Sequence, residues 1–265
     1  MSAFAVVPRP LARGWKRPRF TLRVMMILVM VLGGWLGWIT HRARVQRQAV
    51  AAIVRAGGYV AYDYDWMNPG AKPRGPAWLR GLIGRDYFDT VWGVGADTPA
   101  ADDAVVAQIG RFSQVRWLGL QGSTVTDAGL AGLSEMHALR TLHMRAPNVD
   151  GSGFRHLSGL RDLKNLHFQQ TPITDENLAY LVPLTGIENL SLTNTRVGDA
   201  GMTHVAKMAG LKKLKLASPN IGDKGLRELG RIHRPIQISV FPKTRITPEG
   251  IDAMKTLFPE MTITP

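Results

Sequence analysis

The stretch that decides the fold runs from Val115 to Arg234 and repeats itself every 24 residues. Its five consecutive blocks read VRWLGLQGSTVTDAGLAGLSEMHA, LRTLHMRAPNVDGSGFRHLSGLRD, LKNLHFQQTPITDENLAYLVPLTG, IENLSLTNTRVGDAGMTHVAKMAG and LKKLKLASPNIGDKGLRELGRIHR. A further block precedes them from Val91, and another follows from Ile236 after one extra residue, which we place at Pro235. A fixed period of this length is the signature of a repeat architecture.

Apolar residues recur at seven positions of each block, namely 1, 4, 6, 11, 16, 19 and 22. Of the 49 such sites in the seven blocks, 48 are apolar, and Ser239 is the exception. Positions 4 and 6 alternate as in a short strand, whereas positions 16, 19 and 22 recur every three residues, as on a helix that faces a core. Each block is therefore predicted to be a strand, a turn and a helix, which bury their apolar side chains by stacking on the neighbouring blocks.

The block pattern LxxLxLxxTxITDxGLxxLxxLxx resembles the leucine-rich repeats, and in particular the membrane-anchored leucine-rich-repeat proteins of planctomycete-type bacteria. Four other stretches share the resemblance: Arg19–Arg23, Gly57–Asp63, Gly75–Arg80 and Ile246–Ile263. The resemblance implies an α/β leucine-rich-repeat solenoid of about seven units, with an amino-terminal cap and a single amino-terminal transmembrane helix. It is nearly silent on function, because fold and function separate.

A hydrophobic segment near the amino terminus, Val24–Ile39, holds sixteen residues without a charge. At about 1.5 Å per residue it spans roughly 24 Å, slightly less than the core of a bilayer. Trp35 and Trp38 lie near its far end, where amphipathic aromatic rings favour the membrane interface. We interpret residues 24–40 as a transmembrane helix that acts as a signal anchor; a cleaved signal peptide and a merely buried helix are the alternatives.

The positive charge of the chain is concentrated around this segment. The net charge of the 265 residues is +13, and residues 1–55 contain ten basic residues and no acidic ones. Six of the ten precede the segment and four follow it, a bias that modestly favours repeats outside the cytoplasm. Residues 56–265 have a net charge of only +3, so no nucleic-acid partner is expected, since such proteins usually carry their charge on the folded face.

These patterns divide the chain into five expected segments. Between the juxtamembrane helix and the first repeat block, Tyr59–Trp66 alternates like a strand and Ala77–Ile83 is predicted to be a short helix. The Pro- and Gly-rich stretches between these two elements are predicted to be loops. The expected segments are a basic amino-terminal segment (1–23), a transmembrane helix (24–40), a juxtamembrane helix (41–57), an amino-terminal cap (58–90) and a leucine-rich-repeat domain (91–265).

No signature of catalysis, cofactor binding or a metal site is found in the sequence. There is no cysteine, which excludes disulfides, thiol catalysis and zinc ribbons. No nucleophile elbow, P-loop, HExxH or strand-to-helix GxGxxG motif is present. His143 and His167 share position 5 of neighbouring strands, but Gly119 and Ser191 beside them are poor metal ligands. We expect a protein that is not an enzyme and has no cofactor and no metal.

Aspartates recur at position 13 of the blocks, just where each helix is expected to start. They are Asp127, Asp175, Asp199 and Asp223. A row of carboxylates also suggests calcium. We interpret the aspartates as helix caps, because a carboxylate there accepts the unpaired backbone N–H groups and suits the positive end of the helix dipole.

The strand face is the predicted working surface. Positions 3, 5 and 7 of each strand point away from the core and line the concave side, where solenoids bind partners. Trp117 and Arg145 are residue types common in binding hot spots, and Gly93, Gly95 and Gly119 are expected to leave the Trp117 ring accessible. The predicted partner-binding residues are Trp117, Gln121, His143, Arg145, Asn165, His167, Gln169, Lys213 and Lys215.

The leading hypothesis is a single-pass, membrane-anchored interaction protein whose repeats lie outside the cytoplasm and bind a protein, with a glycan as an alternative ligand. A structural spacer or scaffold of the envelope is a second hypothesis. A third is a cytoplasmic adaptor that resembles an F-box-type substrate receptor without the F-box. Gly33 and Gly37 form a GxxxG motif, which predicts a weak homodimer through the membrane helix.

Overall fold

The computed structural model describes residues 22–63 and 72–264, and the chain divides into two units between His41 and Arg42. Helix α1 (Leu22–Arg55) begins in the first unit and ends in the second. The predicted basic segment lies outside the described residues except for its last two residues. The last three residues of the predicted cap strand and the first part of the loop after it also lie outside them.

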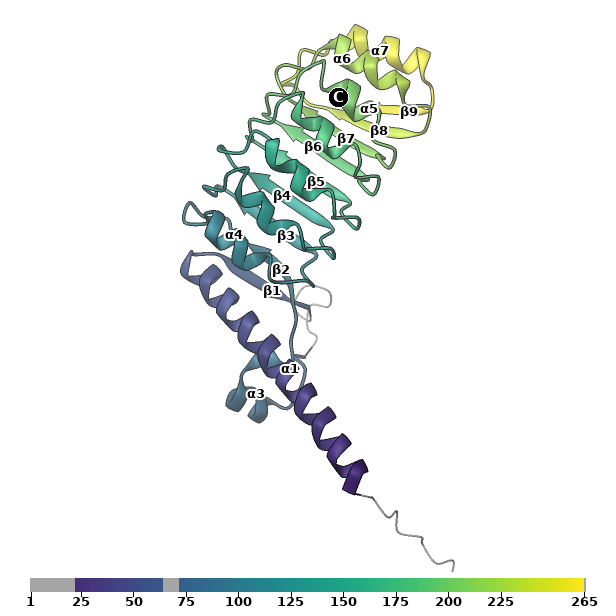
Figure 1. Ribbon diagram of the computed structural model, residues 1–265. Coiled ribbons are helices and arrows are strands. Elements are labelled where there is room, and N and C mark those ends of the chain that lie inside the picture. Colours follow the sequence, from purple (N-terminus) through teal and green to yellow (C-terminus); the bar gives the residue numbers. More distant parts are fainter. Residues whose placement is uncertain (1–21, 64–71, 265) are drawn as a thin grey trace, which may run out of the picture. The chain divides into compact units, whose positions relative to one another are not determined.

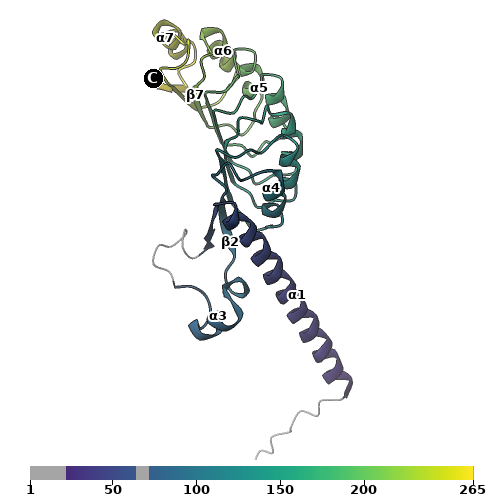
Figure 2. The same cartoon turned by 90° about the vertical axis from the view of Figure 1, so that its left-hand side faces the viewer.

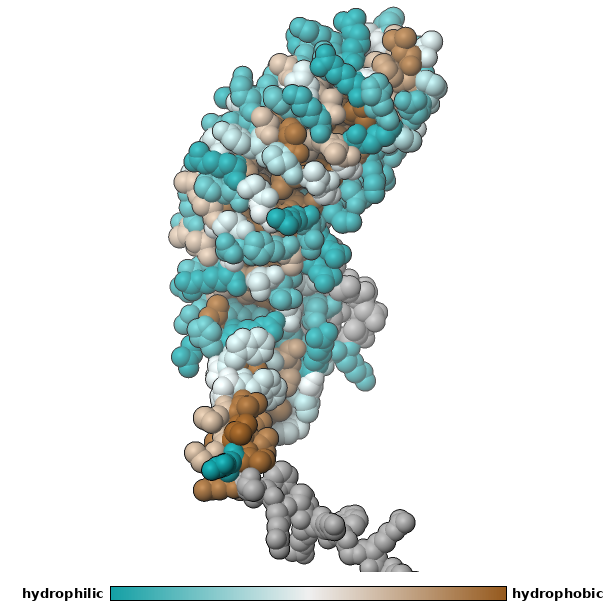
Figure 3. Space-filling model, turned by 45° about the vertical axis from the view of Figure 1, so that its right-hand side comes forward, coloured by the Kyte–Doolittle hydropathy of each residue, from teal (hydrophilic) through white to brown (hydrophobic). Residues whose placement is uncertain are grey.

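The first unit is described only as the apolar turns of α1. Its large apolar side chains from Leu22 to Trp38 are exposed, and they form the brown band next to the grey residues in Figure 3. Helix α1 is long and apolar enough to cross a membrane. A signal sequence near an amino terminus meets the same criterion of length and hydropathy. A Cβ added at Gly33 or Gly37 would meet nothing within 4 Å, so this side of the helix is open.

The described residues of the second unit form one sheet of nine strands that follow one another in chain order (Figure 1). Strand β1 (Tyr59–Tyr62) pairs antiparallel with β2, and β9 (Met261–Thr264) pairs parallel with β8. The strands between them are parallel, and each belongs to one predicted block: β2 (Val91–Gly95), β3 (Trp117–Gln121), β4 (Thr141–Arg145), β5 (Asn165–Gln169), β6 (Asn189–Thr193), β7 (Lys213–Ala217) and β8 (Ile236–Val240). The chain thus forms the predicted α/β leucine-rich-repeat solenoid.

Short helices cover one face of the sheet, so that the sheet lies on the inner side of the arc and the helices on the outer side (Figure 2). Those of the middle repeats are 3₁₀ helices, which have three residues per turn and so explain why apolar positions 16, 19 and 22 recur every three. The outer elements are α4 (Asp103–Ile109), η2 (Gly129–Leu133), η3 (Ser152–Leu157), η4 (Asn177–Leu181), α5 (Met202–Ala206), α6 (Asp223–Glu228), η5 (Leu229–Arg231) and α7 (Pro248–Leu257).

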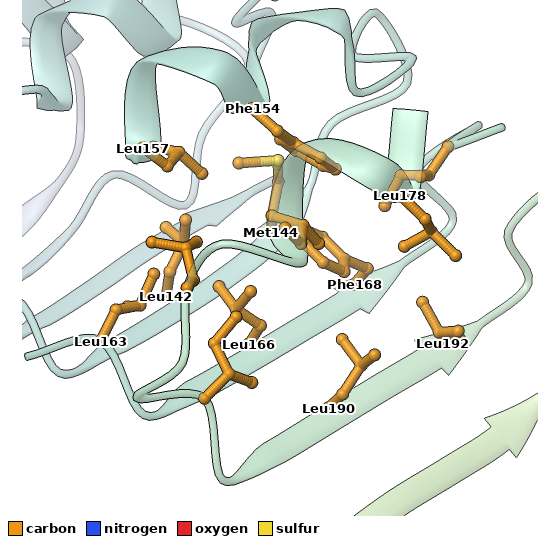
Figure 4. Packing of buried hydrophobic residues seen from close by; sticks show 14 of the residues in the cluster. Leu142, Met144, Phe154, Leu157, Leu163, Leu166, Phe168, Leu178, Leu190 and Leu192 are labelled. Atoms are coloured by element: carbon orange, nitrogen blue, oxygen red, sulfur yellow. The ribbon is translucent and has the colours of Figure 1, made fainter. Parts of the chain in front are cut away.

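The core is continuous along the solenoid. In the six blocks that begin at Val91 and end at Arg234, every one of the seven predicted apolar positions is buried. Figure 4 shows the middle of this core, where Leu142, Leu166 and Leu190 come from successive strands. The Phe154 and Phe168 rings stack beside them with centroids 5.1 Å apart. No single repeat could bury such a face alone, so stability depends on the stack.

The last block corrects two predictions. Lys215 pairs with Ser239, and Ile238 rather than Ser239 takes the buried strand position, so the extra residue does not lie at Pro235. It lies between Val240 and Arg245, because Gly222 bridges to Arg245 one residue later than the other repeats require. Leu257, at predicted core position 22, is exposed, and its neighbour Phe258 packs against the core instead.

The position-13 aspartates also correct a prediction, because their hydrogen bonds go to the following repeat rather than to their own helix. Asp127 accepts N–H groups from residues 150, 151 and 153, the shortest at 2.7 Å. Asp199 accepts those of Gly222 (2.7 Å) and Gly225 (3.0 Å), whereas Asp175 accepts one, from Gly198 (2.7 Å). These carboxylates therefore link consecutive repeats.

The residues before the first repeat close the open end of the core. Ala49 and Ile53 of α1 are fully buried in it, whereas Ala52 and Ala56 beside them are only half buried. Helix α3 (Ala77–Ile83) forms as predicted and is followed by η1 (Arg85–Tyr87). Gln46 is also buried, and its Nε2 donates to the Asp89 carbonyl oxygen at 3.0 Å. This end of the sheet is thus covered.

Candidate protein-binding face

The parallel register aligns the predicted site residues in columns on the inner face of the sheet. Trp117, Thr141, Asn165, Asn189, Lys213 and Gln237 pair in sequence and form one column. Gly119, His143, His167, Ser191, Lys215 and Ser239 form the second. Gln121 pairs with Arg145, and Gln169 pairs with Thr193, in the third. All nine predicted residues therefore share one face, although they extend over five strands from β3 to β7.

An aromatic ladder crosses the amino-terminal half of this face. The Trp117 ring stacks on Tyr59 at 6.3 Å between centroids and forms an edge-to-face pair with His143 at 5.8 Å. His143 in turn meets His167 edge to face at 4.4 Å. The Trp117 ring is half buried rather than open on both sides. The ladder joins side chains of four strands of the sheet, β1, β3, β4 and β5.

Glycines make room for this ladder. A Cβ at Gly95 would collide with the Tyr59 ring, and one at Gly119 would lie 2.8 Å from the Trp117 ring. Their role is therefore to let two rings lie down on the sheet, which differs from the predicted role of leaving Trp117 accessible. The sequence alone did not indicate Tyr59, because its place depends on the antiparallel register of β1 with β2.

The two imidazoles of the ladder are held neutral. Burial lowers the pKa of His143, although the carboxylate of Asp97 acts in the opposite direction. The pKa of His167 is lowered to about 4 by burial first, and then by His143 and Lys215. At neutral pH both rings are uncharged, so the ladder offers an apolar surface with hydrogen-bonding nitrogens, a combination that suits binding of another protein.

The two ends of the face differ in charge. Asp97, at position 7 of the first block, accepts the backbone N–H of Gln121 at 2.9 Å and lies 3.5 Å from the Tyr59 hydroxyl. At the other end, Lys213 and Lys215 are exposed, and the Lys215 ammonium lies 4.4 Å from the centroid of the Phe241 ring. Asp97 was missed in the sequence, although its block position places it on this face.

Amides connect the middle of the face. Asn165 Nδ2 donates to Thr141 Oγ1 at 2.9 Å, and Asn189 Nδ2 donates to Asn165 Oδ1. Next to these hydrogen-bonded amides, the face has a hollow of about 470 Å³ that extends over β5 to β8. A smaller hollow of about 60 Å³ lies between Gln121, Arg145 and Gln169. The face therefore has two recessed areas beside the aromatic ladder.

Solved bacterial leucine-rich-repeat structures resemble this chain only distantly. Internalin C2 of Listeria monocytogenes matches with a TM-score of 0.42 and 17% identity, over 66% of this chain and 81% of its own. A leucine-rich-repeat protein of Leptospira interrogans matches with a TM-score of 0.37 and 14% identity, over 60% of this chain and 45% of its own. The sequence matches no protein-family model and no curated protein. The function is therefore argued from the face itself.

Proposed function

We propose that this chain is a membrane-anchored interaction protein, without catalysis, that binds a protein partner through the inner strand face. The observation that carries the proposal is the ladder of Tyr59, Trp117, His143 and His167 on the side of the sheet opposite the short helices of the described repeats. None of the four side chains belongs to the buried core. Tryptophan and tyrosine are among the residues that most often dominate the binding energy between proteins.

Arg145 and the neighbouring glutamines extend this ladder toward the rim of the face. Arg145 and Gln121 are exposed and paired across adjacent strands, and Gln169 lies on the next strand. Exposed, long polar side chains around a half-buried aromatic centre match the usual anatomy of an interface, which has an apolar core and a polar rim. The ladder therefore supplies affinity, and the rim supplies specificity.

Anchoring is the second part of the proposal. The apolar side chains of α1 from Leu22 to Trp38 are exposed, and their contact with water is unfavourable. Insertion of this part of the helix into a bilayer removes that contact. The basic residues before this segment favour an amino terminus in the cytoplasm, with the repeats outside it. In this arrangement Gly33 and Gly37 are available for a weak helix–helix contact in the membrane.

Quantitative co-purification tests the binding proposal. Full-length wild type is compared with Trp117→Ala, His143→Ala and Arg145→Ala, and with Lys207→Ala on the outer surface as the matched control. We expect a defined set of proteins to be lost from the first three variants and retained by the control. If all four variants capture the same proteins as wild type, the inner face is not the binding site.

Protease treatment of intact cells tests the anchoring proposal, with an epitope tag placed after Pro265. Loss of the tag while the anchor stays in carbonate-washed membranes is the expected result. A tag that becomes sensitive only after lysis and is then located in the cytoplasm would overturn the proposed topology. A protein released from membranes by carbonate would overturn the anchor itself.

A further inference from the structure

We propose that the carboxy-terminal half of the inner face is a docking site for an acidic segment of the protein partner, one that presents two carboxylates to Lys213 and Lys215. This inference rests on the proposed function and specifies the partner's chemistry. The site is the hollow of about 470 Å³ over β5 to β8. Its lining residues are Asn165, His167, Asn189, Leu190, Ser191, Lys213, Leu214, Lys215, Gln237 and Ser239.

The charge of this hollow points to an anion. Two of its ten lining residues are lysines and none is acidic. Within the described part of the chain, no carboxylate forms an ion pair with the ammonium of Lys213 or Lys215. The remaining polar groups are amides, hydroxyls and one imidazole, which can donate hydrogen bonds to carboxylate oxygens.

The lysines at position 2 of the blocks differ from Lys213 and Lys215 because they form ion pairs with a carboxylate. Lys164 and Lys212 both pair with Glu188, at 2.8 and 2.9 Å, and these two hydrogen bonds lower the pKa of Glu188 to about 2. Glu188 therefore offsets part of the charge of the two lysines at position 2 of the blocks, whereas no carboxylate of the described residues forms an ion pair with those at positions 3 and 5. Lys212 and Lys213 are adjacent in the sequence, so this difference is due to the face that each one occupies.

The lysines are held where two carboxylates could meet them. Lys213 and Lys215 are two residues apart on one strand, so their Cα atoms are roughly 6.6 Å apart. The Lys215 ammonium is positioned over the Phe241 ring, which favours a cation at that point. An extended peptide with acidic residues at alternate positions presents its carboxylates at the same spacing, so it matches the strand beneath it.

The opposite end of the face sets the direction of the partner. Asp97 lies beside the Tyr59 and Trp117 end of the ladder, whereas the lysines lie four and more strands away at β7. An acidic segment is favoured over β7 and disfavoured near Asp97. The partner is therefore oriented with its acidic part toward the carboxy-terminal repeats and its apolar part over the ladder.

The test uses the full-length chain in lipid nanodiscs and two synthetic peptides, one with glutamate at alternate positions and one with glutamine in their place. A photoreactive group on each peptide reports where it binds. We expect the glutamate peptide to form adducts on β7 and β8, with weaker binding at high salt. The basic amino-terminal segment also attracts acidic peptides, so adducts are mapped by residue and not counted in total.

Charge-removing variants complete the test. Lys213→Gln with Lys215→Gln is compared with Lys207→Gln with Lys224→Gln, which changes the net charge equally on the outer surface. We expect adducts on β7 and β8 to fall at least about tenfold in the first pair, as when a pair of charge-assisted contacts is lost, and to stay within about twofold of wild type in the second. Circular dichroism verifies that both pairs fold.

His167 provides an independent signal, because it lines the same hollow. A carboxylate bound beside it should raise the pKa of its imidazole above about 4, and nuclear magnetic resonance of the ring measures this. Equal binding of the glutamine peptide, or unchanged adducts in the Lys213 and Lys215 variant, would overturn the inference. Binding of a heparin oligosaccharide without the glutamate peptide would assign the hollow to a sulfated glycan instead. None of these outcomes bears on the aromatic ladder, so the proposed function is tested separately by the Trp117, His143 and Arg145 variants.

Discussion

The aspartates that link consecutive repeats predict a graded loss of stability. Asp199 accepts two backbone N–H groups of the next repeat, Asp175 accepts one, and no hydrogen bond to the Asp252 side chain is seen among the described residues. A hydrogen bond to a charged group contributes about 1.5–3 kcal/mol, and truncation also leaves the donors without a partner. We take the low end of that range because the carboxylates are partly exposed.

The substitutions Asp199→Ala, Asp175→Ala and Asp252→Ala should therefore lower the free energy of unfolding by about 3, about 1.5 and less than about 0.5 kcal/mol, respectively. Urea unfolding followed by circular dichroism measures the order. Native-state hydrogen exchange adds a local signal, since the amides of Gly222 and Gly225 should lose protection only in the Asp199 variant. Equal losses for all three variants, or unchanged exchange at these two glycines, would refute the inter-repeat role.

Four other predictions concern the core and the face. Phe168→Ala should destabilise the chain by about 3–5 kcal/mol, and Gly110→Ala by about 1–3 kcal/mol because its Cβ would meet the Gly132 carbonyl oxygen, both measured as urea midpoints. The pKa of His167 is about 4 in the fold against an ordinary 6.5, so its neutral form is favoured and stability should fall as pH drops from 6.5 toward 4. His167→Gln should flatten that part of the pH profile, and an unchanged slope would contradict a neutral, half-buried ring. Gly95→Ala should move the Tyr59 ring away from Trp117 and alter the tryptophan fluorescence, whereas identical spectra would refute the stacking.

The repeat predicted the core well, for a physical reason. A period of 24 residues places equivalent side chains at equivalent positions of the stack, so pattern alone assigned buried residues such as Leu142 and Phe168. The same period predicted the inner face, because a parallel register aligns position 5 of one strand with position 5 of the next. Side-chain direction therefore followed from sequence.

The sequence was less informative where contacts depend on structure between repeats. The aspartates looked like caps of their own helices, but the turns bring the N–H groups of the next repeat closer. The extra residue of the last repeat was misplaced because Pro235 and the loop after Val240 fit the pattern almost equally well until the pairing of Lys215 with Ser239 was known. Tyr59 joined the ladder only through an antiparallel pairing that no repeat predicts.

The central claim is that the inner strand face binds a protein, and site-specific photo-crosslinking in living cells tests it most directly. A photoreactive residue is placed in turn at Gln121 and Gln169 on the inner face and at Lys207 and Arg227 on the outer surface. We predict protein adducts of defined mass from the two inner positions, which disappear when Trp117→Ala is added, and none from the outer positions. Adducts that form equally on both surfaces, or that persist in the Trp117 variant, would contradict the account.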